Sequence, residues 1–403
     1  SSQETKAQCF WGALNERLTT GHHGGMLADA MMKAKVIHLD LKSIVPLMLI
    51  PLILILAASL LACAAPAPVP TQPTTTSTME PQHKDQLFGR YPCSTDGSPV
   101  FTSVLFPPHL ITGILPMGKM NPQSGHVTPT DHLYIHRDVP LGEDVNYVVA
   151  PADGFIVNIQ RFGQDRPLDR DNPLSPTVPD YRLIFMHSCT VFTIFIHLGE
   201  FAPAIAEKVG QISLNGQWVD KPIEVKAGEP IAKFGATSLD WSVHDADTTL
   251  AGFVLPEHYE SEPWKIHTVD PFQLYSEPIK SELLSKMIRT VEPRAGKIDY
   301  DIDGKIVGTW FMDGTVDYSG NVPPTSKYWQ GHLSIAYGYI DPTQIRISFG
   351  LDTGINDDLY CKVCGGAYGV RGNQPDPATV GPDSGIVKYE LMSRTDEGPY
   401  QGQ

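Results

Sequence analysis

Short apolar runs separated by turn sequences dominate the middle of the chain, from about Leu87 to Ile279. The runs are rich in Val, Ile and Phe, which is the composition of strands, and turns such as Pro151–Gly154 and Lys226–Pro230 stand between them. The pattern predicts strands at residues 147–150, 154–162, 181–187, 190–198 and 230–235, with a surface loop at the proline- and aspartate-rich residues 166–180.

Helical periodicity is convincing at one place beyond the first 86 residues, at residues 273–289, where four apolar residues at helical spacing follow Pro278. We take this helix as the close of a first β domain at residues 87–290. Apolar runs resume at residues 305–311, 333–339, 344–349 and 385–391, and predict a second β domain at residues 291–403, a small sandwich or barrel. The expected fold class is therefore mostly β: an antiparallel sheet domain followed by a smaller β domain.

The first 62 residues are interpreted as upstream residues and a signal peptide. Lysines precede an apolar run at residues 44–61, and the run ends in Leu60-Leu-Ala-Cys63. This order is that of a secretory signal, and its end resembles a bacterial lipobox, whose cysteine becomes lipidated. A plain membrane span is the alternative, but no basic stop-transfer residues follow. We therefore expect an exported lipoprotein of the bacterial cell envelope, held to the membrane by Cys63, with residues 63–86 as a Pro/Thr-rich linker.

Composition narrows the choice of function. The length of 403 residues suggests two folded domains or one large one, and the hydrophobic fraction of 41% is enough for real cores. The 35 glycines and 35 prolines favour turns and short strands. The formal net charge of −15 argues against a nucleic-acid partner. Six scattered cysteines do not form the pattern of a disulfide scaffold. A lone Cys361-Lys-Val-Cys364 favours a local disulfide or two free thiols over zinc in an exported protein.

The candidate chemistry lies in histidines and carboxylates. His126 and Asp131 are close in sequence, and His197 and His244 stand downstream within or at the end of apolar runs. Such a set can give Zn²⁺ three protein ligands and leave a fourth position for water. Ordinary roles stay open, as a surface histidine for His126, a turn cap for Asp131 and a core histidine for His197. Further candidates near the site by sequence are His132, His136 and His187, and carboxylates expected to lie in turns or to orient a ligand are Asp240 and Asp245.

Five motifs follow one another in a familiar order: His126…Asp131, Pro151–Ile156, Phe195–Leu198, Val225–Ile231 with Gly235, and Val243-His244. Over roughly residues 120–250 this order resembles the M23 peptidases, the lysostaphin/LytM-type peptidoglycan endopeptidases. The Val-Lys-Ala-Gly-Glu-Pro-Ile turn is the most specific part of the likeness. The resemblance implies that His126, Asp131 and His244 bind zinc and that His197 is the catalytic histidine.

Two features depart from the M23 pattern. Asp131 follows His126 by five positions instead of four, and on a strand an odd spacing points two side chains to opposite faces, so that a bend near Pro129 is required. In addition, Ser242 stands where the family has the first histidine of His-Leu-His, and serine cannot act as a cationic acid at neutral pH.

Two functions from different classes follow. The first is a zinc-dependent endopeptidase acting on peptidoglycan cross-links or peptides. The second is a catalytically degenerate M23-like module that binds cell-wall or peptide ligands without cleaving them. Ser242 is the feature that discriminates between them. In the C-terminal domain, Asp301-Ile-Asp-Gly304 does not predict an EF-hand, because Met312 stands at position twelve of the loop in place of glutamate.

Overall fold

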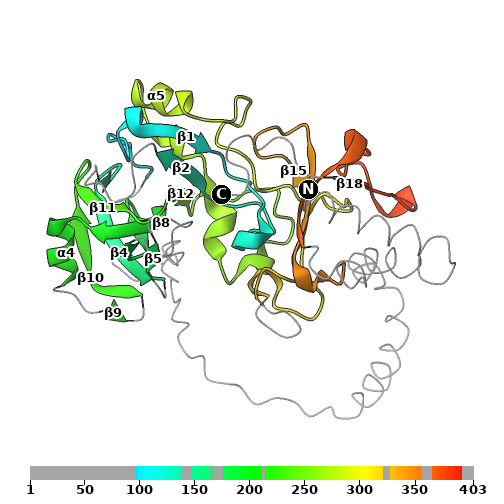
Figure 1. The fold of residues 1–403 in the computed structure, drawn as a ribbon, viewed down its shortest axis with the longest axis horizontal. Helices are drawn as coiled ribbons and strands as arrows, with labels where there is room; N and C mark the ends of the chain where they lie inside the picture. The colour runs from blue at the N-terminus through cyan, green and yellow to red at the C-terminus, as the bar shows by residue number, and fades with distance from the viewer. Residues whose placement is uncertain are drawn as a thin grey trace, which may run out of the picture. The chain divides into compact units, whose positions relative to one another are not determined.

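A computed structural model of the chain describes residues 97–137, 147–162, 165–167, 176–210, 214–215, 217–320, 327–355 and 365–392. The predicted signal peptide, the linker and Cys361-Lys-Val-Cys364 lie outside these residues. The described part of the chain is mostly β, with two antiparallel sheets, a two-stranded ladder and two α-helices (Figure 1). The predicted fold class is confirmed.

Eleven strands form the larger sheet, in the order β1-β2-β12-β8-β7-β4-β10-β9, with β11 paired to β3 and β8 and with β13 paired to β12. Their bounds are β1 (Ile111–Leu115), β2 (Leu133–Arg137), β3 (Val148–Val149), β4 (Gly154–Arg161), β7 (Tyr181–Met186), β8 (Val191–Phe201), β9 (Leu214–Asn215), β10 (Trp218–Val225), β11 (Pro230–Phe234), β12 (Ser238–Asp245) and β13 (Thr268–Val269). Strands β8 and β12 have a paired strand on each side, and most of their side chains are buried, so both of their faces are covered.

Alternation along β12 separates an apolar face from a polar face. Leu239, Trp241 and Val243 are fully buried in the main hydrophobic core. The residues between them, Asp240, Ser242 and His244, must point to the opposite face, because successive side chains on a strand alternate. Strand β8 alternates in the same way: Val191 and Phe195 belong to the main core, whereas Phe192 and Ile194 belong to a second cluster on the other face.

The strands predicted in the first domain are observed with small shifts of their ends, as β3, β4, β7, β8 and β11. The expected surface loop at residues 166–180 contains a short ladder of β5 (Arg166–Pro167) and β6 (Thr177–Val178), and its middle lies outside the described residues. The predicted helix at residues 273–289 is shorter than expected. Only Ile279–Ser285 is α-helical, as α5, and residues 271–274 form a 3₁₀ turn because Pro271 and Pro278 interrupt the hydrogen-bond pattern. A second helix, α4 (Pro203–Val209), begins with proline at its first position.

The remaining helical turns are of the 3₁₀ type and connect strands. They are η2 (Pro108–Leu110), η3 (Pro122–Ser124), η4 (Pro256–Tyr259), η5 (Pro263–His267), η6 (Pro271–Leu274), η7 (Asp317–Ser319), η8 (Leu351–Thr353), η9 (Arg371–Asn373) and η10 (Pro382–Ser384). Of these, η5 has consequences for the site. No helix in the described ranges is both long and apolar enough to cross a membrane.

The second sheet has five antiparallel strands in sequential order, with a core of Ile335, Ile345, Ile347, Phe349 and Val370. Its strands are β14 (Gly308–Trp310), β15 (Leu333–Tyr337), β16 (Ile345–Phe349), β17 (Gly366–Val370) and β18 (Leu391–Met392). The described residues show one sheet here, where a sandwich or barrel was expected. The run at residues 385–391 is extended only at its end, because the η10 turn and Gly385, with a φ of 67°, precede it.

Two features besides strand pairing hold the chain together: apolar residues after position 290 that are buried in the main core, and a disulfide bond at Cys189. Ala295, Ile298 and Tyr318 lie beyond the predicted domain boundary at residue 290, yet they are buried in the main core with the first sheet. Cys189, in the turn between β7 and β8, is disulfide-bonded. A disulfide is typical of proteins that fold in an oxidising compartment.

Candidate functional site

The polar face of β12 forms the floor of the candidate site. Strand β12 pairs with β8 on one side and β2 on the other, so that Ser242 lies beside Ile194 and Asp240 beside Tyr134. Asp240, Ser242 and His244 are all buried, at 4%, 4% and 0% relative exposure. Polar groups at such depth require hydrogen bonds or charge partners. Ser242 and His244 bond each other, and the other partners come from segments distant in sequence.

The predicted pair His126 and Asp131 lies in a bent loop outside any strand. The main chains of Asn121 and His126 exchange two hydrogen bonds, of 2.6 and 3.0 Å, around a turn that ends at Gly125, whose φ is 91°. The chain bends again through residues 127–132 before it enters β2. The objection from odd spacing on a strand therefore does not apply to these two residues. The buried Lys265 holds the bend by donating from Nζ to the carbonyl oxygen of Pro129 at 2.7 Å.

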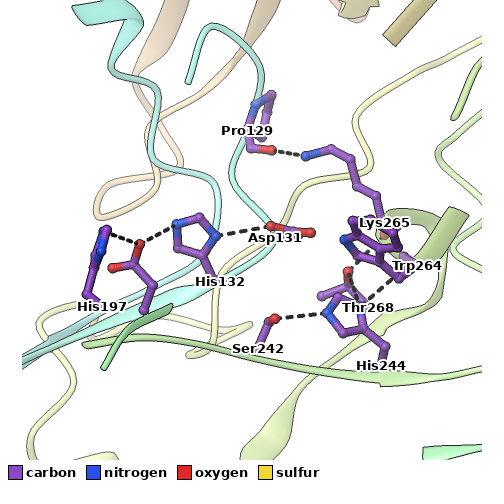
Figure 2. A network of polar contacts seen from close by, with 10 residues as sticks. Pro129, Asp131, His132, His197, Ser242, His244, Trp264, Lys265 and Thr268 are labelled. Atoms are coloured by element: carbon purple, nitrogen blue, oxygen red, sulfur yellow. Dashed lines mark hydrogen bonds and ion pairs between the residues drawn. The ribbon is translucent and has the colours of Figure 1, made fainter. Parts of the chain in front are cut away.

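Carboxylates and imidazoles alternate through the centre of the site, in a row that we call the acid–imidazole chain: Asp131, His132, Asp240, His197 and Asp180. Figure 2 shows Asp131, His132 and His197 of this row. His132 Nδ1 lies 3.1 Å from Asp131 Oδ1, and its Nε2 lies 3.4 Å from Asp240 Oδ2. The same Asp240 oxygen lies 3.4 Å from His197 Nε2. Two of the predicted residues, Asp131 and His197, are thus joined through His132, a further candidate, and Asp240, a carboxylate expected to lie in a turn or to orient a ligand.

His197 is held in an unusual conformation. Its φ is 71°, in the left-handed region that non-glycine residues seldom occupy, and such strain is often found at functional sites. Its Nδ1 donates to the carboxylate of Asp180, at 3.1 and 3.3 Å to the two oxygens, and the Asp180 side chain is completely buried. The carboxylate of Asp180 therefore orients the imidazole through Nδ1. The side chain keeps 18% exposure, so part of the ring is accessible to solvent.

His244 has a defined tautomer. Its Nδ1 lies 2.9 Å from the carbonyl oxygen of Trp264, which can only accept, so Nδ1 carries the proton. Nε2 then has the free electron pair, and it accepts a hydrogen bond from the hydroxyl of Ser242 at 2.8 Å. Backbone carbonyls fix metal-binding histidines in the same way, through the ring nitrogen that does not face the metal.

Burial sets the protonation of the three predicted ligands. Burial, followed by the charges of His132 and Lys265, lowers the pKa of His126 to about 3. Burial also lowers the pKa of His244 to about 4, although Asp131 acts against the shift. For Asp131 burial by itself raises the pKa, but the hydrogen bond from His132 and the charge of Lys265 prevail and hold the pKa well below its usual range. At neutral pH the set is two neutral imidazoles and one carboxylate.

The turn η5 and its neighbours are the part of the site that the sequence did not predict. Trp264 orients His244, Lys265 holds the loop at Pro129, and the Thr268 hydroxyl donates to the Lys265 carbonyl at 2.8 Å while lying 3.2 Å from His244 Nδ1. Glu262 precedes the turn, and burial, with the charge of Asp131, raises its pKa to about 7. No motif or periodicity marks residues 262–268, so only their contacts reveal them.

The other candidates divide into two groups. His132 is at the centre of the acid–imidazole chain, and its pKa is raised because Asp240 and Asp131 outweigh the opposite effect of burial. His187 packs between Phe101 and Phe185 and bonds Thr193, as a core histidine. His136 is buried on β2, and burial lowers its pKa to about 4. Asp240 lies within β12 and outside any turn.

Whether the three predicted ligands can share one ion depends on their arrangement. Asp131 and His244 influence each other electrostatically, as do His126 and Asp131. Within the described ranges, no group of three or more His, Cys, Asp or Glu side chains is arranged so that it could hold a metal ion. The assignment of His126, Asp131 and His244 to a metal therefore stays a prediction.

Comparison with known proteins adds no relative. No family model matches the chain, and no curated protein matches it. The likeness to the M23 peptidases consequently rests on the motifs alone.

Proposed function

We propose that the chain is a cell-envelope lipoprotein whose first β domain is an M23-like, zinc-dependent endopeptidase acting on peptidoglycan cross-links or peptides. His126, Asp131 and His244 are the proposed zinc ligands, and His197 is the proposed catalytic residue. The observation that carries the proposal is the hydrogen bond from His244 Nδ1 to the Trp264 carbonyl. It leaves Nε2, which accepts from the Ser242 hydroxyl, as the ring nitrogen whose lone pair can bind a metal ion.

The donor set suits zinc in type and in protonation. Metal ligands must be deprotonated, and both imidazoles and the carboxylate are in that form at neutral pH. Imidazole nitrogen and carboxylate oxygen are ordinary zinc ligands, and three of them leave one position open. Two existing bonds must be exchanged for this: Ser242 leaves His244 Nε2, and Asp131 Oδ1 turns from His132.

A zinc ion bound there supplies a Lewis acid for the scissile carbonyl and a water of nearly neutral pKa. Residues of the chain itself would transfer the proton. Asp180 fixes the His197 ring through Nδ1, so that Nε2 is the atom that takes or gives a proton. Asp240 and His132 connect that atom to Asp131 in the metal-free protein.

A second function, a module that binds cell-wall or peptide ligands without cleaving them, is favoured by one observation. The Ser242 hydroxyl stands at the position of the first histidine of the family's His-Leu-His motif and bonds the nitrogen through which His244 would hold zinc. A serine there removes one imidazole that could stabilise a developing oxyanion.

The proposed location follows from Leu60-Leu-Ala-Cys63, which is outside the described residues. The disulfide at Cys189 supports an oxidising compartment. The proposal therefore places the β domains outside the membrane, tethered through a lipid on Cys63 and facing the cell wall. Labelling with a tagged fatty acid tests the anchor, and equal labelling of Cys63→Ala would refute it.

The test of the main proposal uses the full chain, purified in detergent. Zinc per chain is measured by elemental analysis for wild type, His244→Gln, Asp131→Asn and His187→Gln. The last variant is a matched control, because His187 is also a buried, hydrogen-bonded histidine with a lowered pKa, but lies in the core. We expect about one zinc in wild type and control, and at least a hundredfold weaker binding in the two ligand variants.

Hydrolysis is then assayed on peptidoglycan and on glycyl peptides, with and without a chelator. Equal traces of metal in all four proteins would end the metallopeptidase proposal. Bound zinc without hydrolysis would select the non-cleaving module, and a Ser242→His variant that gains cleavage would identify the missing imidazole as the reason.

A further inference from the structure

Arg182, on β7, carries a positive charge that no carboxylate of the described residues pairs with. Its Nη1 donates one long hydrogen bond, of 3.4 Å, to Gln160 Oε1, and its guanidinium lies 5.0 Å from the centre of the Trp264 ring. Its Nε is buried, and no acceptor in the described part of the chain reaches it. A guanidinium has five N–H donors and stays charged, so a half-buried arginine with these contacts is left short of acceptors and of negative charge.

Strand pairing puts Arg182 on the face of the sheet that carries the candidate site. Arg182 lies opposite Ile196 of β8, and Ile196 lies opposite Asp240 of β12. Residues directly opposite each other on paired strands point to the same face, so Arg182 and Asp240 share one row of the sheet, two strand spacings or about 10 Å apart. The Trp264 ring beside the guanidinium belongs to the residue whose carbonyl accepts from His244 (Figure 2).

A second polar group without a partner lies in the neighbouring row of the same face. Asp240 has Asn158 as a distant neighbour there: Asn158 of β4 is 3% exposed and lies opposite Ile184, two positions from Arg182 on β7. Its Oδ1 is buried, and no donor among the described residues bonds it. A buried amide oxygen requires an N–H or O–H group, and a guanidinium requires an anion. A peptide with a free carboxylate has both kinds of group.

We propose that Arg182 binds a carboxylate of the ligand, so that the site takes peptides with a free carboxylate group near the position beside Asp240. The inference rests on the proposed function, because it takes the ligand to be a peptide, and it holds for cleavage and for binding without cleavage. An extended peptide advances about 3.3 Å per residue, so about three residues separate the carboxylate from the part of the ligand above Asp240. Arginine can bond a carboxylate through two parallel hydrogen bonds, which lysine cannot do.

Glu262 is the carboxylate of the chain that could take the place of the ligand. It precedes η5, and the charges of Glu262 and Arg182 influence each other. The ion pairs of the described residues do not include these two. A role limited to balancing Glu262 would make Arg182→Gln less stable without changing which ligands the protein prefers.

Arg137 offers a matched control on the opposite face of the sheet. Its guanidinium lies 4.8 Å from the centre of the Phe234 ring, and its Nε is buried without a hydrogen-bond partner in the described residues, as that of Arg182 is. Phe234 belongs to the main core, whereas Trp264 packs against the second cluster. Arg137→Gln therefore removes a comparable arginine from the face that does not carry Asp240.

The experiment measures the affinity of the full chain, in detergent, for tetraglycine with a free terminal carboxylate and for tetraglycine amide, by ligand-observed NMR titration. A chelator is present throughout, so that a bound metal ion cannot attract the carboxylate. We expect wild type and Arg137→Gln to bind the carboxylate probe at least about tenfold more tightly than the amide, because a charge-assisted hydrogen-bond pair contributes that much. Arg182→Gln and Arg182→Met should bind the two probes within about twofold of each other, and Arg182→Lys should keep part of the preference.

Comparing two probes separates a role in binding from a role in folding. A purely structural role of Arg182 would weaken both probes equally, whereas the proposed contact is lost for the carboxylate probe alone. Circular dichroism checks that each variant folds, and Arg182→Gln decides should Arg182→Met fail to fold. A third probe, an amidated glycyl peptide with one internal glutamate, distinguishes a side-chain carboxylate from a terminal one, and a preference for either supports the inference.

Three results would overturn the inference: equal affinity of wild type for all probes, an unchanged preference in Arg182→Gln, or failure of every probe to bind. None of them decides the proposed function, which depends on zinc content and hydrolysis measured separately. Conversely, a protein that holds no zinc but prefers the carboxylate probe through Arg182 would retain the peptide site and lose the metallopeptidase.

Discussion

At the scale of single residues, burial decides what each histidine can do. His187 and His244 are both buried with lowered pKa values, but their partners differ. His187 bonds a threonine hydroxyl and lies against two phenylalanine rings, whereas His244 bonds the Ser242 hydroxyl and the Trp264 carbonyl of the η5 turn. Only the neighbours distinguish a core histidine from a candidate ligand.

The pKa of His187 gives a prediction about acid stability. Burial lowers its pKa to about 4, whereas the ring in the unfolded chain titrates near 6.5. Above pH 6.5 the ring is neutral in both states. As the pH falls towards 4, the unfolded chain takes a proton that the folded chain refuses, so stability is lost, up to about 3 kcal/mol for this residue. Urea unfolding of wild type and His187→Gln at pH 4.5 and 7.5 measures the effect.

The expected result is a smaller loss of unfolding free energy in His187→Gln than in wild type. Other buried histidines contribute to the wild-type loss, so the difference between the two proteins is the quantity of interest. An identical pH dependence would show that His187 is protonated in the folded protein, contrary to its burial.

At the scale of elements, the end of β8 and the end of β11 approach each other closely beside His197. The Gly235 amide donates to the His197 carbonyl at 2.7 Å. A Cβ on Gly235 would lie 2.8 Å from backbone atoms of Leu198, which cannot move aside without displacing β8. Because Gly235 has no side chain, the chain at the end of β11 can approach β8 closely enough to bond the His197 carbonyl.

Gly235→Ala should lower the unfolding free energy by about 1–3 kcal/mol, because it forces the backbones of β8 and β11 apart. Any hydrolysis should fall more than stability does, since His197 moves with β8. Gly210→Ala is the control: Gly210 ends α4 with a φ of −64°, and an added Cβ would meet its neighbours at 3.5 Å, an ordinary contact. Chemical unfolding of the two variants compares them, and equal stabilities would contradict the close approach.

At the scale of the whole molecule, the segment after α5 is bound to both sheets. Ala295 is completely buried in the main core, and Arg289, 1% exposed, donates to the Tyr339 carbonyl at 2.9 Å. The Gly252 carbonyl accepts from the Asp301 amide at 2.8 Å. The domain boundary predicted at residue 290 stays a prediction, but these contacts argue that the first sheet depends on residues beyond it.

A chain that ends after residue 290 should accordingly be several kcal/mol less stable than the full chain, since it exposes the apolar surface that Ala295, Ile298 and Tyr318 cover. The full chain should unfold the two sheets in one transition. Calorimetry of both chains checks this. Two separate transitions in the full chain, the first matching the shortened chain, would instead establish independent domains.

The sequence by itself determined strands β3, β4, β7, β8 and β11. They follow from short apolar runs between turn sequences, which require no knowledge of distant segments. From the order of its motifs it also predicted one site of His126, Asp131, His197 and His244, and this assignment stays a prediction. It could not find Asp180, which lies at the end of a proline- and aspartate-rich insertion, or Lys265, which no pattern marks.

Tertiary structure alone decided how these residues are paired. It placed Asp240 between His132 and His197, assigned the proton of His244 to Nδ1, and brought Lys265 under the loop of Asp131. The reason is that hydrogen bonds and charge interactions depend on distances of a few ångströms. Segments far apart in sequence come within such distances only when the whole chain folds.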